Sequence, residues 1–286
     1  MSRFLQPESL NQALEALAPG RAKVLAGGTD LMVALRAARL EGGELPEMLL
    51  DVSRLAELQR CELDGGSPYL GAGLSFRRLE SDPAVLARIP VLARAAATVG
   101  SVQVRQSATI GGNVANASPA ADGLTALTAL GARAEIASDQ GARRRPLEEL
   151  ITGPYQTALA SHELILGFVL APPPEPAGQV FLKVGRRGEV AVARLNLAVC
   201  LDQEMADPRV VLGSCFPTPR RLRGVEELLA GATPGPDLWR QAGEMAASHF
   251  TEVCGWRASA GYKVPAIARC TAAALARAWA GLENGS

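Results

Sequence analysis

Two short segments with almost no side-chain bulk lie far apart in the chain, and they constrain the fold more than any other feature. The first is "AGGTD", residues 26–30, and the second is "TIGGN", residues 109–113. Adjacent glycines let a ligand or another backbone approach the main chain closely. Both segments also carry short polar side chains. The fold therefore needs two turns whose main chain can be contacted directly by a ligand or by another backbone segment.

The first segment sits between a predicted strand near residues 24–26 and a predicted helix that begins at about Leu31. Backbone N–H groups at a helix start have no partner within the helix, and the helix dipole adds about half a positive charge there. An anionic pyrophosphate can bind at such a turn. Taken alone, the segment also fits a plain turn.

The second segment is followed within a few residues by "SPAAD", residues 118–122. Two separate turns of glycine and hydroxyl residues suit a long ligand with phosphates and sugar hydroxyls, each turn serving a different part. Asp122 would accept a hydrogen bond from a ribose or ribityl hydroxyl. The alternative is that Asp122 caps the helix predicted to start near Leu124, and both roles stay open.

Composition narrows the class of protein. A chain of 286 residues favours two domains. Because 29 basic side chains balance 29 acidic ones, the chain has no overall attraction for nucleic acid. The sequence contains no long apolar run typical of a membrane span, and its first residues do not resemble a secretory signal. Five widely spaced cysteines suggest free thiols in a reducing cytoplasm, so we expect a cytoplasmic protein.

Other sites are not indicated by the sequence. The chain has neither a complete G-x-G-x-x-G nor a G-x-x-x-x-G-K-S/T phosphate motif, and no G-x-S-x-G nucleophile motif. Two histidines and scattered cysteines argue against a hydrolase, a zinc site or an iron–sulfur cluster on this chain. We therefore assign no catalytic and no metal-binding residue.

Hydrophobic spacing and turn residues predict the main elements. A proline-rich tract at residues 172–178 is the expected domain boundary, because consecutive prolines cannot continue a β-ladder. The predicted helices cover residues 10–17, a stretch from 31, one that ends before 100, 124–130, 225–231, 237–250 and 265–282. One predicted strand ends near residue 52, and two more flank a hairpin turn at residues 139–141. The other predicted strands cover residues 161–170, 179–185 and 190–202.

Together, "VLAGGTDLMV" (residues 24–33) and "TIGGNVANASPAADG" (residues 109–123) resemble the FAD-binding, or medium, subunit of the molybdenum hydroxylases. That family includes xanthine dehydrogenase, carbon monoxide dehydrogenase and 4-hydroxybenzoyl-CoA reductase. The similarity runs nearly end to end, through "FLKVGRRGEVAVARLNLAV" and the late "RASAGYK". It implies an α+β fold: a vanillyl-alcohol-oxidase/PCMH-type FAD-binding domain over residues 1–175, then a smaller CO-dehydrogenase-flavoprotein-type C-terminal domain over residues 178–286.

The resemblance also implies which residues bind the cofactor, expected to be noncovalent FAD. The two glycine segments would hold its phosphates, Asp122 a ribose or ribityl hydroxyl, and Ile165 and Lys183 would flank the flavin. Core packing for Ile165 and a strand-edge position for Lys183 are open alternatives. Val99 stands near a position where xanthine-type members have an aromatic residue. The full expected set is Val24, Leu25, Ala26, Gly27, Gly28, Thr29, Asp30, Leu31, Thr109, Ile110, Gly111, Gly112, Asn113, Ser118, Asp122, Ile165 and Lys183.

By the same resemblance, the chain is an electron-transfer subunit. Its partners would be an iron–sulfur small subunit and a molybdopterin large subunit, in a dimer of heterotrimers, with NAD or a quinone as the electron acceptor. The molybdenum cofactor and the iron–sulfur clusters would lie on those partners. Two alternatives stay open: a self-contained FAD reductase of the enolpyruvyl-reductase type on the same fold, and a flavin-free structural subunit.

The glycine segments generate a first prediction. Gly28→Val and Gly111→Val should each abolish FAD retention and leave the chain folded, because a side chain there would intrude on the phosphates. The flavin absorbance of each purified variant, with circular dichroism as the test of folding, measures both expectations. Normal FAD content in both variants would contradict the assignment.

Overall fold

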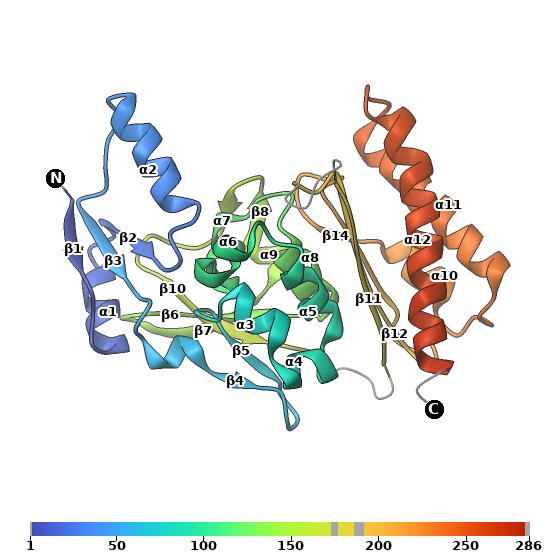
Figure 1. The fold of residues 1–286 in the computed structure, drawn as a ribbon, viewed down its shortest axis with the longest axis horizontal. Coiled ribbons are helices and arrows are strands. Elements are labelled where there is room, and N and C mark those ends of the chain that lie inside the picture. Colours follow the sequence, from blue (N-terminus) through green and yellow to red (C-terminus); the bar gives the residue numbers. More distant parts are fainter. Residues whose placement is uncertain (1, 173–176, 186–191, 284–286) are drawn as a thin grey trace.

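The computed structural model describes residues 2–172, 177–185 and 192–283. In this part, sheets of three, five and four strands follow one another, and a small two-stranded sheet comes between the last two strands of the five-stranded sheet along the chain. Figure 1 shows the three-stranded sheet at the left, the five-stranded sheet among helices in the centre, and the four-stranded sheet with its helices at the right. The predicted α+β class is confirmed.

The N-terminal sheet is parallel, with strand order β1-β3-β2. Helix α1 starts at Ser9, whose hydroxyl accepts from the backbone N–H of Gln12, and it buries Ala13 and Leu17. Helix α2 buries no residue and projects from the molecule in Figure 1. The elements are β1 (Arg3–Leu5), α1 (Leu10–Leu17), β2 (Ala22–Leu25), α2 (Leu31–Leu40) and β3 (Met48–Asp51).

The central sheet is antiparallel, with strand order β4-β5-β10-β6-β7. The hairpin predicted at residues 139–141 is confirmed as β6 and β7. Its arginines form ion pairs across the sheet, Arg143 with Glu163 and Arg144 with Glu135. The strands are β4 (Cys61–Glu62), β5 (Tyr69–Gly71), β6 (Arg133–Ser138), β7 (Gly141–Pro146) and β10 (Leu164–Val169).

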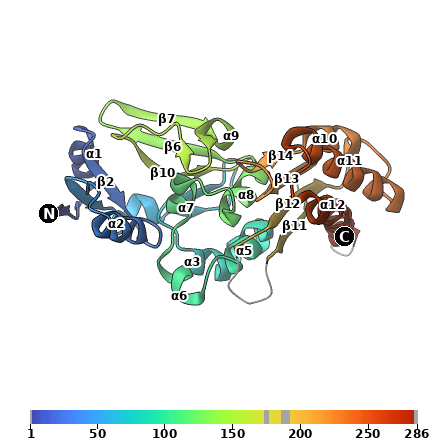
Figure 2. The same ribbon diagram turned by 90° about the horizontal axis from the view of Figure 1, so that it is seen from above.

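Helices α3 and α5 to α8 lie on one side of this sheet, away from its edge strand β7, whereas α9 lies beside β6 and β7 (Figure 2). Ser75 caps α3 by accepting from the backbone N–H of Arg78, a role that serine often has directly before a helix. Helix α6 was not predicted; Ser101 starts it directly after the turn at Gly100. The remaining elements are η1 (Ala56–Gln59), α3 (Phe76–Ser81), α4 (Pro83–Arg88), α5 (Pro90–Ala97), α6 (Val102–Ser107), α7 (Ile110–Asn116), α8 (Asp122–Ala129), α9 (Leu147–Leu150), β8 (Ile151–Gly153) and β9 (Gln156–Thr157).

The C-terminal sheet is antiparallel, with strand order β11-β12-β13-β14, and three helices follow it. Helix α12 begins at Ala260 rather than at Pro265, where the helix was predicted to start. Ala260 is fully buried, so the apolar face of the helix extends back past the proline. The elements are β11 (Ala177–Val184), β12 (Leu195–Asp202), β13 (Arg209–Gly213), β14 (Arg220–Arg221), α10 (Arg223–Leu229), α11 (Pro236–Cys254) and α12 (Ala260–Glu283).

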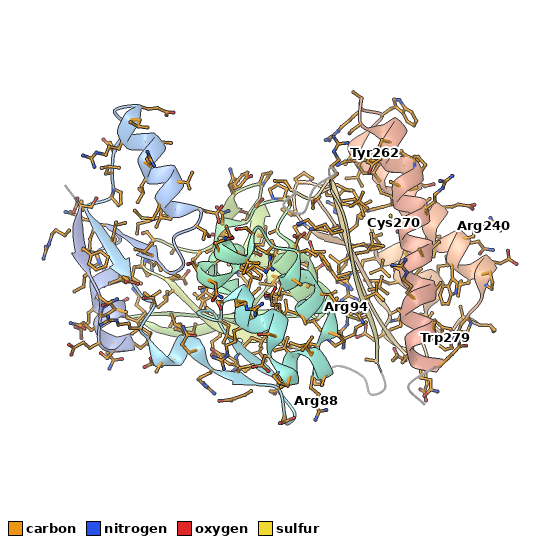
Figure 3. All side chains as sticks on the ribbon, viewed as in Figure 1. Arg88, Arg94, Arg240, Tyr262, Cys270 and Trp279 are labelled. Carbon is orange, nitrogen blue, oxygen red and sulfur yellow. The ribbon has the colours of Figure 1, made fainter. Side chains whose placement is uncertain are left out.

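Strand β12 is buried along its whole length because helices pack on both faces of its sheet. Leu197 and Val199 belong to the core formed with α11 and α12. Ala198 and Cys200 point the other way and join the core of the preceding part of the chain. Arg94 of α5 adds a hydrogen bond to this contact, to the backbone oxygen of Gln179 at 2.7 Å (Figure 3).

The predicted domain boundary, the free cysteines and the lack of a membrane span can be compared with the described residues. Residues 173–176 of the proline-rich tract lie outside the described residues, and a domain boundary between 175 and 178 stays a prediction. All five cysteines lie within the described ranges and are free. Over those ranges, no helix has the length and apolar character needed to cross a membrane.

The packing of α11 on α12 generates a prediction. A Cβ at Gly243 of α11 would lie 2.3 Å from the carbonyl oxygen of Ala268 on α12, so Gly243→Ala must separate the helices. We expect this variant to lower the free energy of unfolding by about 1–3 kcal/mol. The control is Gly261→Ala in α12, where a Cβ would meet no atom within 4 Å and the expected change is below about 1 kcal/mol. Urea unfolding measures both, and equal effects would contradict the close helix contact.

Candidate functional site

The turn between β2 and α2 presents unpaired backbone donors. Within the described residues, the N–H groups of residues 27–31 have no hydrogen-bond acceptor. Gly28 is left-handed, with φ at 69°, and Asp30 precedes the helix without capping it through its side chain. Consecutive unpaired N–H groups at the start of a ten-residue helix form a site for an anion. The unpaired backbone donors expected at the first glycine segment are present, and phosphate binding there stays a prediction.

The structure brings the two glycine segments together. A Cβ at Gly27 would lie 1.9 Å from the carbonyl oxygen of Ser107 and 2.9 Å from the Cα of Ala108. The backbone of the first turn therefore contacts the residues directly before Thr109. Only glycine permits this approach, because any side chain at position 27 would overlap the neighbouring backbone.

The second glycine segment differs from the first because four of its five backbone N–H groups, those of residues 110–113, have acceptors within the described residues. Thr109 caps the seven-residue helix α7, and its hydroxyl accepts from the N–H of Gly112 at 3.1 Å. The N–H of Asn113 bonds to the backbone oxygen of Thr109, and those of Ile110 and Gly111 bond to the backbone oxygens of Leu74 and Ala72, directly after β5. A cofactor contact here would have to use the N–H of Thr109, the exposed surface of Gly112 or side-chain oxygens.

Gly111 serves protein packing. A Cβ at this buried position would lie 2.6 Å from the Cβ of Ala72 and 2.7 Å from its carbonyl oxygen. The prediction that Gly111→Val leaves the chain folded is therefore wrong, since the valine would be driven into its neighbouring segment. At Gly28 the nearest atoms, from Leu25 and Met32, are 3.2 Å away, and strain at positive φ is the larger effect.

Asp122 lies in a buried polar network between the two halves of the molecule. Its Oδ2 atom is 2.6 Å from Lys183 Nζ, and its Oδ1 atom accepts from Asn196 at 2.7 Å. Thr98 donates to Oδ2 at 3.2 Å, and Lys183 also donates to the backbone oxygen of Thr98 at 2.8 Å. Asp122 comes from α8, Thr98 from the end of α5, and the other two from the C-terminal sheet.

Burial raises the pKa of Asp122, and Lys183, Asn196 and Thr98 oppose that rise. These three contacts favour the charged form of the Asp122 carboxyl, although the residue is only 4% exposed. The expectation that Asp122 caps its own helix is wrong, because its side chain makes no capping bond. Asn113 caps α8 instead, by accepting from the backbone N–H of Leu124 at 3.1 Å.

The other expected residues occupy varied positions. Ile165 is 4% exposed within the core, and the carbonyl of its neighbour Leu166 accepts from the N–H of Ala72, beside Gly111. Ser118 accepts from the backbone N–H of Ala120. In the part of the chain that the structure describes, no hydrogen bond or ion pair joins the first glycine turn to Asp122 or Lys183. A direct role of each in cofactor binding stays a prediction.

Two residues of the network, Thr98 and Asn196, were absent from the predicted set. Asn196 stands alone as an amide in the apolar strand sequence "LNLAVCL", and that isolation is a signal of a buried polar contact. Thr98 ends a helix in "AAATVG" and carries no such signal.

Comparison with known proteins places this site in context. Residues 1–173 match the FAD binding domain in molybdopterin dehydrogenase, and residues 180–278 match the CO dehydrogenase flavoprotein C-terminal domain. The chain is 30% identical to the glyceraldehyde dehydrogenase medium chain of Sulfolobus acidocaldarius, over 91% of this chain and 92% of that protein. It is 29% identical to the xanthine dehydrogenase FAD-binding subunit of Escherichia coli O157:H7, over 94% and 93%.

A solved structure is similar over almost the whole length. It is a carbon monoxide dehydrogenase from Hydrogenophaga pseudoflava that lacks the Mo-pyranopterin moiety of its molybdenum cofactor. The TM-score is 0.87 at 27% identity, covering 98% of this chain and 97% of the other. Both parts of the chain therefore share the architecture of that structure.

The buried ion pair generates a prediction with a defined pH dependence. Because the pKa of Asp122 is raised in the folded protein, this carboxyl lowers the free energy of unfolding as pH rises through that pKa. Lys183→Met removes the main opposing charge and should raise the pKa further. We expect a loss of about 3–5 kcal/mol near neutral pH, partly recovered on acidification as Asp122 takes up a proton.

The control is the double variant Asp122→Asn/Lys183→Met, which buries no unpaired charge and should not recover on acidification. Urea unfolding of both proteins across a pH series measures the difference. Parallel pH profiles for the single and double variants would contradict the pairing.

Proposed function

This chain belongs to the family of FAD-binding subunits of molybdenum hydroxylases, and on that premise we propose that it carries electrons from partner iron–sulfur clusters to an external acceptor. It is an oxidoreductase subunit with an FAD-binding domain. The observation that carries the proposal is the turn at residues 27–31, whose unpaired N–H groups match the needs of a dinucleotide phosphate.

The chain's own residues have two separate tasks in this proposal. Residues 24–31, which include the end of β2, the turn and the first residue of α2, would bind the diphosphate through backbone N–H groups. Asp122, held by Lys183, would accept from a ribose or ribityl hydroxyl. Thr109, Ile110, Gly111, Gly112, Asn113, Ser118 and Ile165 would complete the wall of the site.

FAD supplies exchange of electrons singly or in pairs, which suits a link between one-electron clusters and a two-electron acceptor. The protein's contribution is to bind and orient it. No covalent attachment is proposed, because neither glycine segment contains a histidine, cysteine or tyrosine.

The partners proposed are an iron–sulfur small subunit and a molybdopterin large subunit, in a cytoplasmic dimer of heterotrimers, with NAD or a quinone as acceptor. The names of the relatives support a multi-subunit assembly, since one is a medium chain and another an FAD-binding subunit. The described residues contain no group of three or more His, Cys, Asp or Glu side chains placed to hold a metal ion. The molybdenum and iron–sulfur chemistry is proposed to lie on the partners, as the family of this chain implies.

The test is reconstitution of the purified chain with FAD, followed by assay with and without its co-purified partners. We expect one FAD per chain, and reduction of the flavin by substrate only when the partners are present. Reduction of the isolated chain by NADPH, with turnover of an enolpyruvyl substrate, would instead establish the reductase alternative. A colourless protein that takes up no FAD would establish the structural one.

A further inference from the structure

Asn196 lies at the centre of the C-terminal sheet, on the face that meets the FAD-binding part of the chain. It is directly opposite Lys183 on β11 and Gly213 on β13 in the register of the three strands. Residues opposite one another in neighbouring strands share a face of the sheet. Asn196 is fully buried, so its amide depends entirely on protein partners.

Both ends of the Asn196 amide are bonded to α8. Its Nδ2 atom donates to Asp122 Oδ1 at 2.7 Å, and its Oδ1 atom accepts from the hydroxyl of Thr125 at 3.1 Å. An ionised carboxylate can only accept, which fixes the orientation of the amide. The Thr125 hydroxyl also lies 3.2 Å from the backbone oxygen of Ala121, so its single proton is shared, and the bond to Asp122 is the stronger of the two that hold the Asn196 side chain.

Asn196 has a role toward Asp122 that the other partners do not share. Within the described residues it is the partner of Oδ1, whereas Lys183 and Thr98 both bind Oδ2. The Thr98 Oγ1 atom is also 2.8 Å from the backbone oxygen of Ala95, and its single proton cannot serve both acceptors fully, so its 3.2 Å bond to Asp122 is the weaker one. Asp122 Oδ1 can accept a second hydrogen bond besides the one from Asn196. The bond from Asn196 therefore determines the direction from which a second donor can approach Oδ1.

The neighbouring strand leaves room for this arrangement. A Cβ at Gly213 would lie 2.1 Å from Asn196 Oδ1 and 2.4 Å from Thr125 Oγ1. Glycine at this position lets the amide and the hydroxyl meet. Adding a methyl group there would displace them without touching Asp122 directly.

We propose that Asn196 is a positioning residue for FAD: it fixes the orientation and the charged state of the Asp122 carboxylate that accepts from the cofactor's sugar hydroxyl. This inference rests on the proposed function, in particular on the role given to Asp122. It adds that the C-terminal half of the chain controls FAD affinity through a residue that does not touch the cofactor.

The groups that face Asp122 define the pH dependence. In the described part of the chain, the charged group acting on it is Lys183 of β11, while Thr98 at the end of α5 and Asn196 of β12 are neutral. Loss of the Asn196 donor removes one of the bonds that favour the carboxylate. FAD affinity should then begin to fall at a higher pH than in the unaltered protein.

The experiment titrates FAD into apo-protein, following flavin fluorescence across a pH series, for Asn196→Leu and Gly213→Ala. We expect FAD binding to weaken by about tenfold or more in Asn196→Leu. In this variant, the fall of FAD affinity on acidification should also begin at a pH closer to neutral. Gly213→Ala should change affinity in the same direction. The control is Thr271→Val, since Thr271 is fully buried in the same half and its hydroxyl has no partner. That control should bind FAD normally.

Asn196→Asp separates positioning from simple structural support. It places a second carboxyl beside Asp122, and two adjacent carboxyls share a proton that restores the missing donor. Its FAD affinity should therefore rise on acidification, opposite to the behaviour of the unaltered protein. If Asn196→Leu fails to fold, Thr125→Val provides the same comparison, because it removes the other partner of the amide with little change in volume.

The outcomes are distinguishable. Unaltered affinity and pH profiles in the Asn196, Gly213 and Thr125 variants would overturn the positioning role while leaving FAD binding intact. Weakened binding with pH profiles parallel to the unaltered protein would overturn it too, because a merely structural defect gives that pattern. An unaltered protein that binds no FAD would overturn the proposed function itself.

Discussion

The structure depends on the burial of both faces of the C-terminal sheet. One face meets α10 and α12, on which α11 packs, and the other meets α5 and α8 of the preceding part of the chain. Most of the inner contact is apolar, with Ala198 and Cys200 at its centre. Its polar contacts include the Asp122–Lys183 pair with Asn196, and the bonds of Gln179 to α4 and α5. A buried ion pair gives little net stability but is costly to break, so it favours one alignment of the two parts over others.

Local sequence determined most of the elements that were predicted correctly. Helix α1 and the β6–β7 hairpin follow from periodicity and turn residues within a few positions of one another. Helix α6 was missed because its six residues are too short to show a period. The start of α12 was missed because a proline usually marks the first turn of a helix, whereas here buried contacts at Ala260 extend the helix beyond it.

The candidate site was predictable where it depends on the backbone and unpredictable where it depends on tertiary contacts. The turn at residues 27–31 combines a strand end, two glycines and a helix start, all visible in the sequence. Gly111 looked the same in the sequence, yet it is required by the approach of Ala72, a residue distant in the chain. Thr98 and Asn196 reach Asp122 only because α5 and β12 pack on either side of α8.

In the proposed function, these two regions would recognise different parts of the cofactor for a physical reason. A diphosphate carries a charge spread over many oxygens, which several backbone N–H groups can satisfy without a defined side-chain geometry. A sugar hydroxyl needs one acceptor at one angle, which requires a side chain held in place by neighbours. The first region stands on a helix that buries no residue, and the second lies between two cores. A ligand that binds both regions therefore stabilises the contact between them by mass action. By the same linkage, the affinity for that ligand depends on the stability of the contact between the C-terminal sheet and helices α5 and α8.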